Sequence, residues 1–245
     1  MKLIINADDF GISKAINLGI IEAFKNGIVT STTLMCNMET TGHAVELAKK
    51  NPKLGVGIHL VLTAGKPLSK DVKTLVDADG NFLKYDKIFK SASIEDIRKE
   101  FRSQMERFIS FGIVPTHIDT HHHVHAKENI FRVVCELAKE INIPVRYIEA
   151  VGKDKYKDIR TTTKLIDNFY DLPMIEPHIL QEICEDNIDI ESLEIMCHPG
   201  YLDHKIISNS SYAYPRVKEL ETLTDKDVIK FIKDKNIQLI NFKDI

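Results

Sequence analysis

Short apolar runs alternate with amphipathic segments along this chain, and that alternation limits the fold more than any other feature of the sequence. Leu3-Ile4-Ile5 is too short for a buried helix and is followed by polar residues 6–9, so it predicts a first strand. A helix is predicted between Ser13, which can cap its N-terminus, and Gly27, which can end it. The same reasoning predicts strands at residues 29–35, 54–60, 117–120, 145–148, 193–197 and 237–242, and helices at residues 41–50, 94–108, 128–140 and 225–233. Strands that alternate with helices form right-handed βαβ units and a mostly parallel sheet.

A parallel sheet of this kind can be open or closed, and periodicity does not decide between the two. Seven or so strands in 245 residues favour an irregular, TIM-like (β/α) barrel, a fold that typically needs about 250 residues. Residues 66–85 read as an irregular loop, and residues 153–187 carry no clear pattern. No repeat or linker is evident, so we expect a single domain over residues 1–245. In such a fold, ligands gather at the carboxyl ends of the strands.

The composition excludes several classes of protein. With 43% hydrophobic residues, 28% charged residues and a net charge of −3, the chain is neither disordered nor built to bind nucleic acid or a membrane surface. No apolar run is long enough for a signal peptide or a spanning helix, so we expect a soluble, cytoplasmic protein. The four cysteines are far apart and predict buried free thiols. No glycine-rich phosphate loop or G-x-S-x-G motif is present.

The histidines are unevenly distributed, and five of the ten fall within residues 117–125. If the chain stays extended there, successive side chains point to opposite faces. Asp119, His121, His123 and His125 then share one face. Imidazole rings suit Zn²⁺ and other divalent metals, and a nearby carboxylate can fix the orientation of a ligating ring. The segment therefore predicts a metal site, although each ring taken alone is equally consistent with a hydrogen bond to backbone.

Three more candidate sites follow predicted strands: the pair Asp8-Asp9, then His59, then His198. A lone histidine in an apolar strand is more often a core residue, and a bare Asp-Asp pair more often caps a helix or faces solvent. Together, however, these sites would converge on one face of the sheet. One carboxylate with two histidines leaves a divalent metal open positions for water and substrate. The second carboxylate can take the proton of that water, and a protonated His198 can donate to a departing amine. The set predicts metal-assisted hydrolysis of an amide or ester.

At these residues the chain resembles the YdjC-like carbohydrate deacetylases, a family that includes chitooligosaccharide deacetylases. The matching stretches follow one another from the first predicted strand to about Leu223. They are residues 6–11, 26–33, 57–63, 65–68, 115–125 and 197–201. Residues 66–91 and 153–187 match least, and we expect these stretches to line or cover the substrate.

The resemblance implies an irregular (β/α) barrel related to polysaccharide deacetylases and the removal of N-acetyl groups from small amino sugars such as chitooligosaccharides. It implies one divalent metal ion, Mg²⁺ or Zn²⁺ with Mn²⁺ or Co²⁺ as alternatives. The ligands it implies are Asp9, His59 and His121, with Asp8 as the base and His198 as the acid. It also matches Arg216 and Glu219, which we expect to form an ion pair that shapes the pocket. A homo-oligomer is possible, and no nucleic acid or membrane partner is expected.

Two alternatives stay open from the sequence. Asp119, His121 and His123 form an Asp-x-His-x-His motif, which metal-dependent phosphoesterases and amidohydrolases also use, although usually on their first strand. A non-catalytic protein that binds metal or sugar is the second alternative. The roles of His122, His123 and His125 are not assigned by the pattern.

Overall fold

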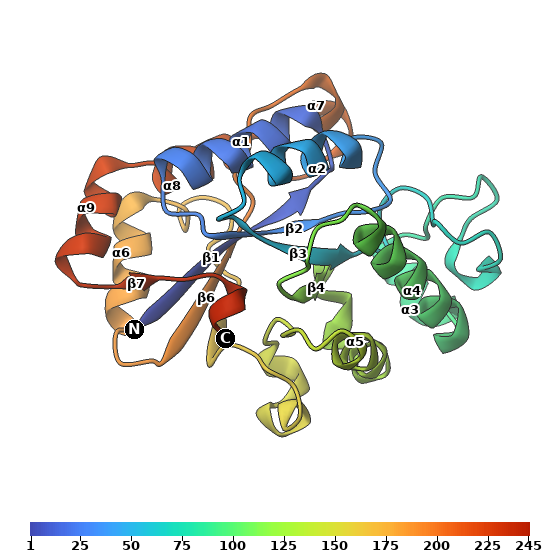
Figure 1. Ribbon diagram of the computed structural model, residues 1–245. Coiled ribbons are helices and arrows are strands. Elements are labelled where there is room, and N and C mark those ends of the chain that lie inside the picture. The colour runs from blue at the N-terminus through green and yellow to red at the C-terminus, as the bar shows by residue number, and fades with distance from the viewer.

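The computed structural model describes residues 1–245 and is built around one seven-stranded sheet (Figure 1). The sheet has the order β4-β3-β2-β1-β6-β5, with β7 beside β1, and every pair of neighbouring strands is parallel. The strands are β1 (Lys2–Phe10), β2 (Ser31–Leu34), β3 (Gly55–Leu60), β4 (Ile118–Thr120), β5 (Lys164–Ile166), β6 (Ser192–Cys197) and β7 (Gln238–Leu239). The sheet curls into a half-barrel, so the expected (β/α) barrel is confirmed in an open form.

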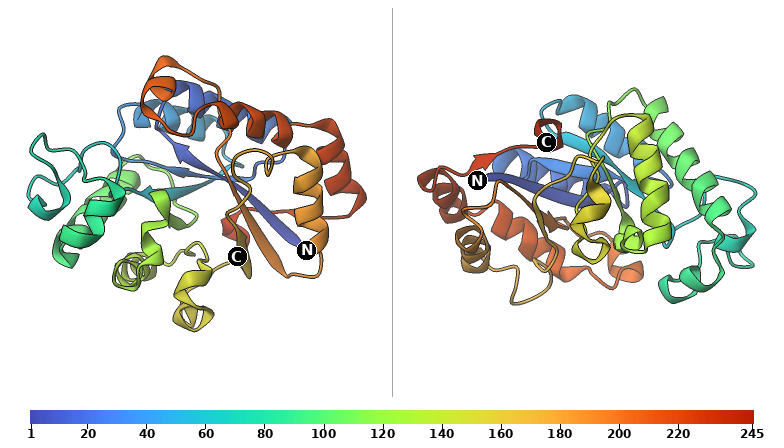
Figure 2. Two further views of the ribbon diagram at one scale, coloured as in Figure 1. Left: turned by 180° about the vertical axis from the view of Figure 1, so that it is seen from behind. Right: turned by 90° about the horizontal axis from the view of Figure 1, so that it is seen from below.

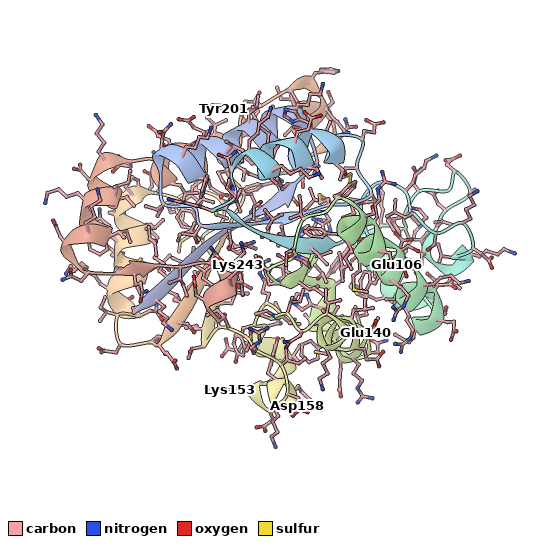
Figure 3. The ribbon with its side chains drawn as sticks, in the orientation of Figure 1. Glu106, Glu140, Lys153, Asp158, Tyr201 and Lys243 are labelled. Atoms are coloured by element: carbon pink, nitrogen blue, oxygen red, sulfur yellow. The ribbon has the colours of Figure 1, made fainter.

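Most of the nine α-helices lie on the outside of the curled sheet, as the views from behind and from below show (Figure 2). The helices are α1 (Lys14–Asn26), α2 (Thr41–Lys50), α3 (Tyr85–Ser91), α4 (Ile94–Ser110), α5 (Glu128–Glu140), α6 (Pro177–Asp186), α7 (His204–Asn209), α8 (Tyr214–Leu223) and α9 (Lys226–Asp234). Ser13 caps α1 by accepting a hydrogen bond from the Ile16 backbone N–H at 3.1 Å. Helices α4 and α5 pack side by side, and Arg102 donates two hydrogen bonds to Glu140, which is labelled in Figure 3. No helix combines the length and apolar character needed to cross a membrane.

The central strands are buried on both faces, which explains why their sequences read as continuous apolar runs. In β1 every residue after Lys2 is buried, and β3 and β6 are buried throughout. One hydrophobic cluster of 55 buried residues spans the chain from Leu3 to Ile237. Polar residues at the carboxyl ends of these strands therefore lie at the edge of a dense core, on rigid supports.

Several predicted elements match the structure closely, and two do not. Helices α2 and α5 have the predicted bounds. Residues 145–148 are not a strand, because Val145 forms only an isolated bridge with Ile118 and its N–H donates to the Arg160 carbonyl. Residues 237–242 give only the two-residue β7, and a 3₁₀ helix begins at Phe242.

A close approach between two glycines fixes the turn that follows β6. A Cβ atom on Gly19, in the middle of α1, would lie 2.5 Å from the Gly200 Cα atom. Only glycine permits this contact, which seats the turn at residues 198–201 against α1. Tyr201, labelled in Figure 3, lies at this junction beside α1. The contact therefore sets the position of His198, two residues before Gly200.

Candidate active site

The carboxyl ends of the central strands open into one cleft with a volume of about 850 Å³. All five residues expected from the sequence line this cleft. Asp8 and Asp9 come from the end of β1, His59 from β3, His121 from the residue after β4, and His198 from the residue after β6. Residues from four separate strands thus meet at one place, as the parallel sheet predicts.

Asp9 has an unusual backbone conformation that brings both carboxylates into the cleft. Its φ is 68°, in the left-handed region where non-glycine residues are uncommon. The pairing of β1 with β2 shifts register between Ala7 and Phe10, at the same place. On a regular strand Asp8 and Asp9 would point to opposite faces, as their adjacency predicts. The irregularity instead lets both side chains line the same cavity.

Three potential ligand atoms converge at Asp9. Asp9 Oδ1 lies 3.1 Å from His121 Nδ1 and 3.5 Å from His59 Nε2. Arg216 Nη2 donates to Asp9 Oδ2 at 2.6 Å, whereas Oδ1 is buried and accepts no hydrogen bond of normal geometry. Burial by itself raises the pKa of Asp9, but Arg216 and His121 hold it well below its usual range. Asp9 is therefore an anionic group with one free oxygen directed at two imidazole nitrogens.

His59 is oriented by a carboxylate behind it. Its Nδ1 lies 2.7 Å from Asp119 Oδ1, and Thr33 donates to Asp119 Oδ2 at 3.0 Å. Burial by itself lowers the pKa of His59, but Asp119 and the neighbouring carboxylates raise it to about 10. The carboxylates around His59 thus attract positive charge, which either a proton on Nε2 or a cation bound to Nε2 would supply. An imidazole whose far nitrogen is held by a carboxylate is the usual arrangement of a histidine that ligates a metal.

Two overlapping groups in the cleft bring potential metal ligands together. The first group contains Asp9, His59 and His121, and the second contains Asp8, His59 and Asp119. Within each group the potential ligand atoms lie within 4.8 Å of one another. In the second group the carboxylates already accept hydrogen bonds from other side chains. The first group contains the unpartnered Asp9 oxygen, and its three residues line the cleft. A carboxylate with two imidazoles suits Zn²⁺, Mn²⁺ or Co²⁺. The first group therefore fits a divalent cation better.

Asp8 is held by a buried arginine. Arg146 donates from Nη1 and Nη2 to the two carboxylate oxygens of Asp8, both at 2.7 Å. The same guanidinium contacts Asp119 at 2.9 Å and Glu194 at 2.8 Å. Burial raises the pKa of Asp8, but Arg146 outweighs this and lowers it below its usual value. Asp8 is therefore ionised and fixed in orientation, and it lies beside the ligand group because it also approaches His59.

His198 lies beside two tyrosine rings that stack on each other and line the same cleft. The ring centroids of Tyr170 and Tyr212 are 5.6 and 5.5 Å from that of His198. Its Nδ1 is buried without a hydrogen-bond partner. Burial lowers the pKa of His198 to about 4, so the ring is neutral near pH 7.

The expected ion pair between Arg216 and Glu219 is wrong. Arg216 pairs with Asp9 instead, with its Nη2 2.6 Å from Asp9 Oδ2. Glu219 accepts hydrogen bonds from the Tyr212 hydroxyl and the His198 backbone N–H. Burial raises the pKa of Glu219 to about 8. Both residues still shape the pocket, but through different partners.

The predicted alternation across the histidine segment is also wrong. Strand β4 ends at Thr120, and residues 121–126 turn in 3₁₀ geometry with His122 and His123 at positive φ. His123 Nε2 faces the Met196 sulfur at 3.1 Å, and His125 is buried against the Thr120 hydroxyl at 2.5 Å. Neither joins a candidate metal group. His122 lines the cleft, with Nδ1 2.9 Å from the Thr63 hydroxyl.

The sequence patterns do not identify Arg146 as a residue of the site. They place Asp119 on one face with the histidines of residues 121–125, whereas in the structure Asp119 holds the His59 ring in position. The signal for Arg146 was present, since it is the one charged residue in the apolar run Val145-Arg146-Tyr147-Ile148. A charge in such a run requires a buried partner. The partners Asp8, Asp119 and Glu194 lie on three other strands, so the sequence alone does not identify them.

The chain is similar over its whole length to known carbohydrate deacetylases. The chain is 75% identical over 245 residues to a carbohydrate deacetylase of Clostridium beijerinckii, with all of both chains covered. It is 40% identical to a chitooligosaccharide deacetylase of Yersinia enterocolitica, covering 99% of this chain and 98% of the relative.

Two solved structures extend the comparison. One is a protein from Enterococcus faecalis V583 that is described as a candidate cellobiose-phosphate cleavage protein. It has a TM-score of 0.94 and 35% identity, and the match covers 99% of this chain and 98% of that protein. A family 4 carbohydrate esterase from Streptomyces lividans has a TM-score of 0.52 at 9% identity, covering 97% and 91% of the chains, and shares the fold. The family model described as YdjC-like protein matches residues 2–234. This chain therefore belongs to the YdjC-like protein family.

Proposed function

We propose that this protein is a metal-dependent deacetylase that removes N-acetyl groups from small amino sugars such as chitooligosaccharides. The observation that supports this most directly is that His59 and His121 converge on a buried carboxylate oxygen of Asp9 that has no hydrogen-bond partner. The ionised Asp8 lies beside this group. The deacetylase names of the relatives supply the substrate class. Asp9, His59 and His121 would hold the cation.

The bound cation would polarise the amide carbonyl and lower the pKa of a water molecule. In the proposed reaction the oxygen of water adds to the carbonyl carbon and the amide C–N bond breaks. Acetate and a free amine result. Asp8 accepts the proton of the water, and Arg146 keeps that carboxylate anionic and oriented.

His198 donates a proton to the departing nitrogen in this proposal. Because its pKa is lowered to about 4, the ring is neutral before reaction. Negative charge that develops next to the ring raises its pKa, so the ring would take a proton from solvent and pass it to the departing nitrogen, while Asp8 releases the proton of the water to solvent. The stacked rings of Tyr170 and Tyr212 beside it limit the positions that the His198 ring can adopt.

The alternatives from the sequence have weaker support. A phosphoesterase or amidohydrolase site built on Asp119, His121 and His123 would need all three around one cation. The Asp119 oxygens are instead occupied by His59, Thr33 and Arg146. A non-catalytic protein that binds metal or sugar would have no need for an ionised carboxylate fixed beside the ligand group.

An acetate-release screen tests the proposal. N-acetylglucosamine and its oligomers are incubated with the protein, with and without a chelator, and phosphate release from sugar phosphates is measured in parallel. We expect acetate from the acetylated sugars, loss of activity with chelator and recovery with Zn²⁺, Mn²⁺, Co²⁺ or Mg²⁺. Release of phosphate without acetate would favour the phosphoesterase alternative. Release of neither product would favour the non-catalytic alternative.

Three further expectations belong with this proposal. A single domain over residues 1–245 is supported by the one large hydrophobic cluster. A cytoplasmic location is consistent with four buried, free cysteines, because thiols stay reduced there. A homo-oligomer stays a prediction, and size-exclusion chromatography with light scattering measures it.

A further inference from the structure

Two exposed aromatic side chains line the cleft, one beside each side of the candidate metal group. Tyr85 and Tyr170 are both 42% exposed, and no other large hydrophobic side chain of such exposure lines this cavity. Tyr85 belongs to α3 and Tyr170 to the segment between β5 and α6. These segments lie on opposite sides of the molecule in Figure 1.

Tyr85 is held in place beside His122, whose ring lies next to that of the proposed metal ligand His121. Its ring makes edge-to-face contacts with Phe89 and with His122, at centroid distances of 4.7 and 6.0 Å. The His122 ring in turn lies 3.9 Å from the ring of His121. His122 is fixed by the Thr63 hydroxyl. Tyr85 is therefore linked to the candidate metal group through one intervening ring.

The segment that carries Tyr85 is anchored to the body of the protein. The backbone N–H groups of Leu68 and Ser69 donate to the buried Glu100 carboxylate at 3.0 and 2.9 Å. Thr74 donates to Asp96 from both its backbone and its hydroxyl. This excursion from the sheet therefore presents Tyr85 in a defined position, so binding there costs little ordering entropy.

Tyr170 is supported on the opposite side. Its ring stacks on Tyr212 at 4.0 Å, and the Tyr212 hydroxyl donates to Glu219 and accepts from the Asp171 N–H. Tyr170 also contacts His198, the proposed proton donor. One face of Tyr170 is covered by Tyr212, so the exposed area faces the cleft and its surroundings.

Exposed aromatic rings that line a polar cleft are suited to sugars. The C–H groups of a pyranose ring form an apolar face, while its hydroxyl groups face outward to polar partners. Burying such a face against an aromatic ring combines apolar contact with attraction between C–H groups and the negative ring face. The cleft volume of about 850 Å³ is near the upper end of the usual range for small-molecule sites, which leaves room for more than one sugar unit.

We propose that Tyr170 stacks on the sugar unit that carries the reacting acetamide and that Tyr85 stacks on the adjacent unit. This proposal rests on the deacetylase function proposed above and adds which side chains select the substrate. Tyr170 takes the reacting unit because it contacts His198. Tyr85 takes the neighbouring unit because His122 separates it from the ligand histidine. The protein therefore prefers a disaccharide or longer oligomer to a monosaccharide.

The test compares kcat/KM for acetate release from the N-acetylglucosamine dimer and monomer. Tyr85→Ala is expected to lower the dimer-to-monomer ratio about tenfold, since loss of one aromatic contact costs about that factor. Tyr170→Ala is expected to lower kcat/KM for both substrates by a similar factor without changing the ratio. Tyr85→Phe and Tyr170→Phe keep the ring and should behave like the parent. Tyr214→Ala, at a side chain 72% exposed outside the cleft, is the matched control.

Several outcomes would overturn the assignment. An unchanged ratio in Tyr85→Ala, or a loss in Tyr85→Phe as large as in Tyr85→Ala, contradicts a stacking role. If the parent releases no acetate from any sugar, the proposed deacetylase function has failed instead. Calorimetric binding of the glucosamine dimer then tests the tyrosines separately. Tyr85→Ala should weaken that binding about tenfold, and equal affinity in both proteins rejects the proposal.

Discussion

Replacing Asp8 with asparagine separates the proposed base from the proposed metal ligands. The amide would keep the size of the side chain but lose its charge and its ability to accept a proton at neutral pH. Asp9, His59 and His121 are unchanged, so metal binding is expected to persist. Loss of a general base costs about 10²- to 10⁴-fold in rate, which corresponds to about 3 to 5 kcal/mol in activation free energy.

The structure also predicts a cost in stability for Asp8→Asn. Arg146 loses one of its two charge-assisted bonds to residue 8 and keeps Asp119 and Glu194. Breaking a buried pair completely costs about 3–5 kcal/mol, and the remaining contacts and the asparagine oxygen reduce that figure. Since domains are stable by about 5–15 kcal/mol, the variant is expected to fold with a lower melting temperature.

The assay measures kcat for acetate release, bound metal per chain and the melting temperature on the same preparations. Asp167→Asn is the control, because Asp167 is an exposed carboxylate that lines the same cleft without a hydrogen bond to Arg146. We expect near-parental turnover in Asp167→Asn and a loss of at least about 100-fold in Asp8→Asn. Normal turnover in a metal-loaded Asp8→Asn protein would refute the assignment of Asp8 as base.

Three other variants test the remaining parts of the site. His121→Ala is expected to lose bound metal and acetate release together, and metal content at the parental level would contradict its role as a ligand. Asp119→Asn is expected to weaken metal affinity about 10- to 100-fold in a chelator competition, because the support of His59 is reduced; unchanged affinity would reject that support. Burial raises the pKa of Glu219 from 4.5 to about 8, so the neutral form is favoured in the folded state. Its contribution to stability is present below pH 4.5 and is lost as pH rises to about 8. Glu219→Gln should therefore flatten the fall in melting temperature over this range, whereas parallel curves for the two proteins would contradict it.

Most of the fold is predictable from the sequence because local signals and burial agree. The helix at residues 41–50 and the helix at residues 128–140 have clear apolar stripes, and both appear with the predicted bounds. The apolar run at residues 145–148 follows the same rules for strands but forms none. There Val145 forms only an isolated bridge with Ile118 and its N–H donates to the Arg160 carbonyl, so the hydrogen bonding that would extend the sheet does not continue along this run.

The candidate site is predictable in its membership and less so in its geometry. Asp8, Asp9, His59, His121 and His198 all line the cleft because parallel strands direct their carboxyl ends to one edge. The left-handed backbone at Asp9 and at two of the histidines is set by the surrounding packing and has no local sequence signal. For that reason the expected alternation of side chains fails at both places.

The ion pair between Asp9 and Arg216 joins residues 207 positions apart. During synthesis on the ribosome, the first strand is complete long before its arginine partner emerges. A nascent chain therefore carries Asp9 for most of its growth without the guanidinium that holds it, and the ligand group reaches its final form only when α8 docks. We expect truncated chains that end before α8 to bind divalent metal more weakly than the whole protein.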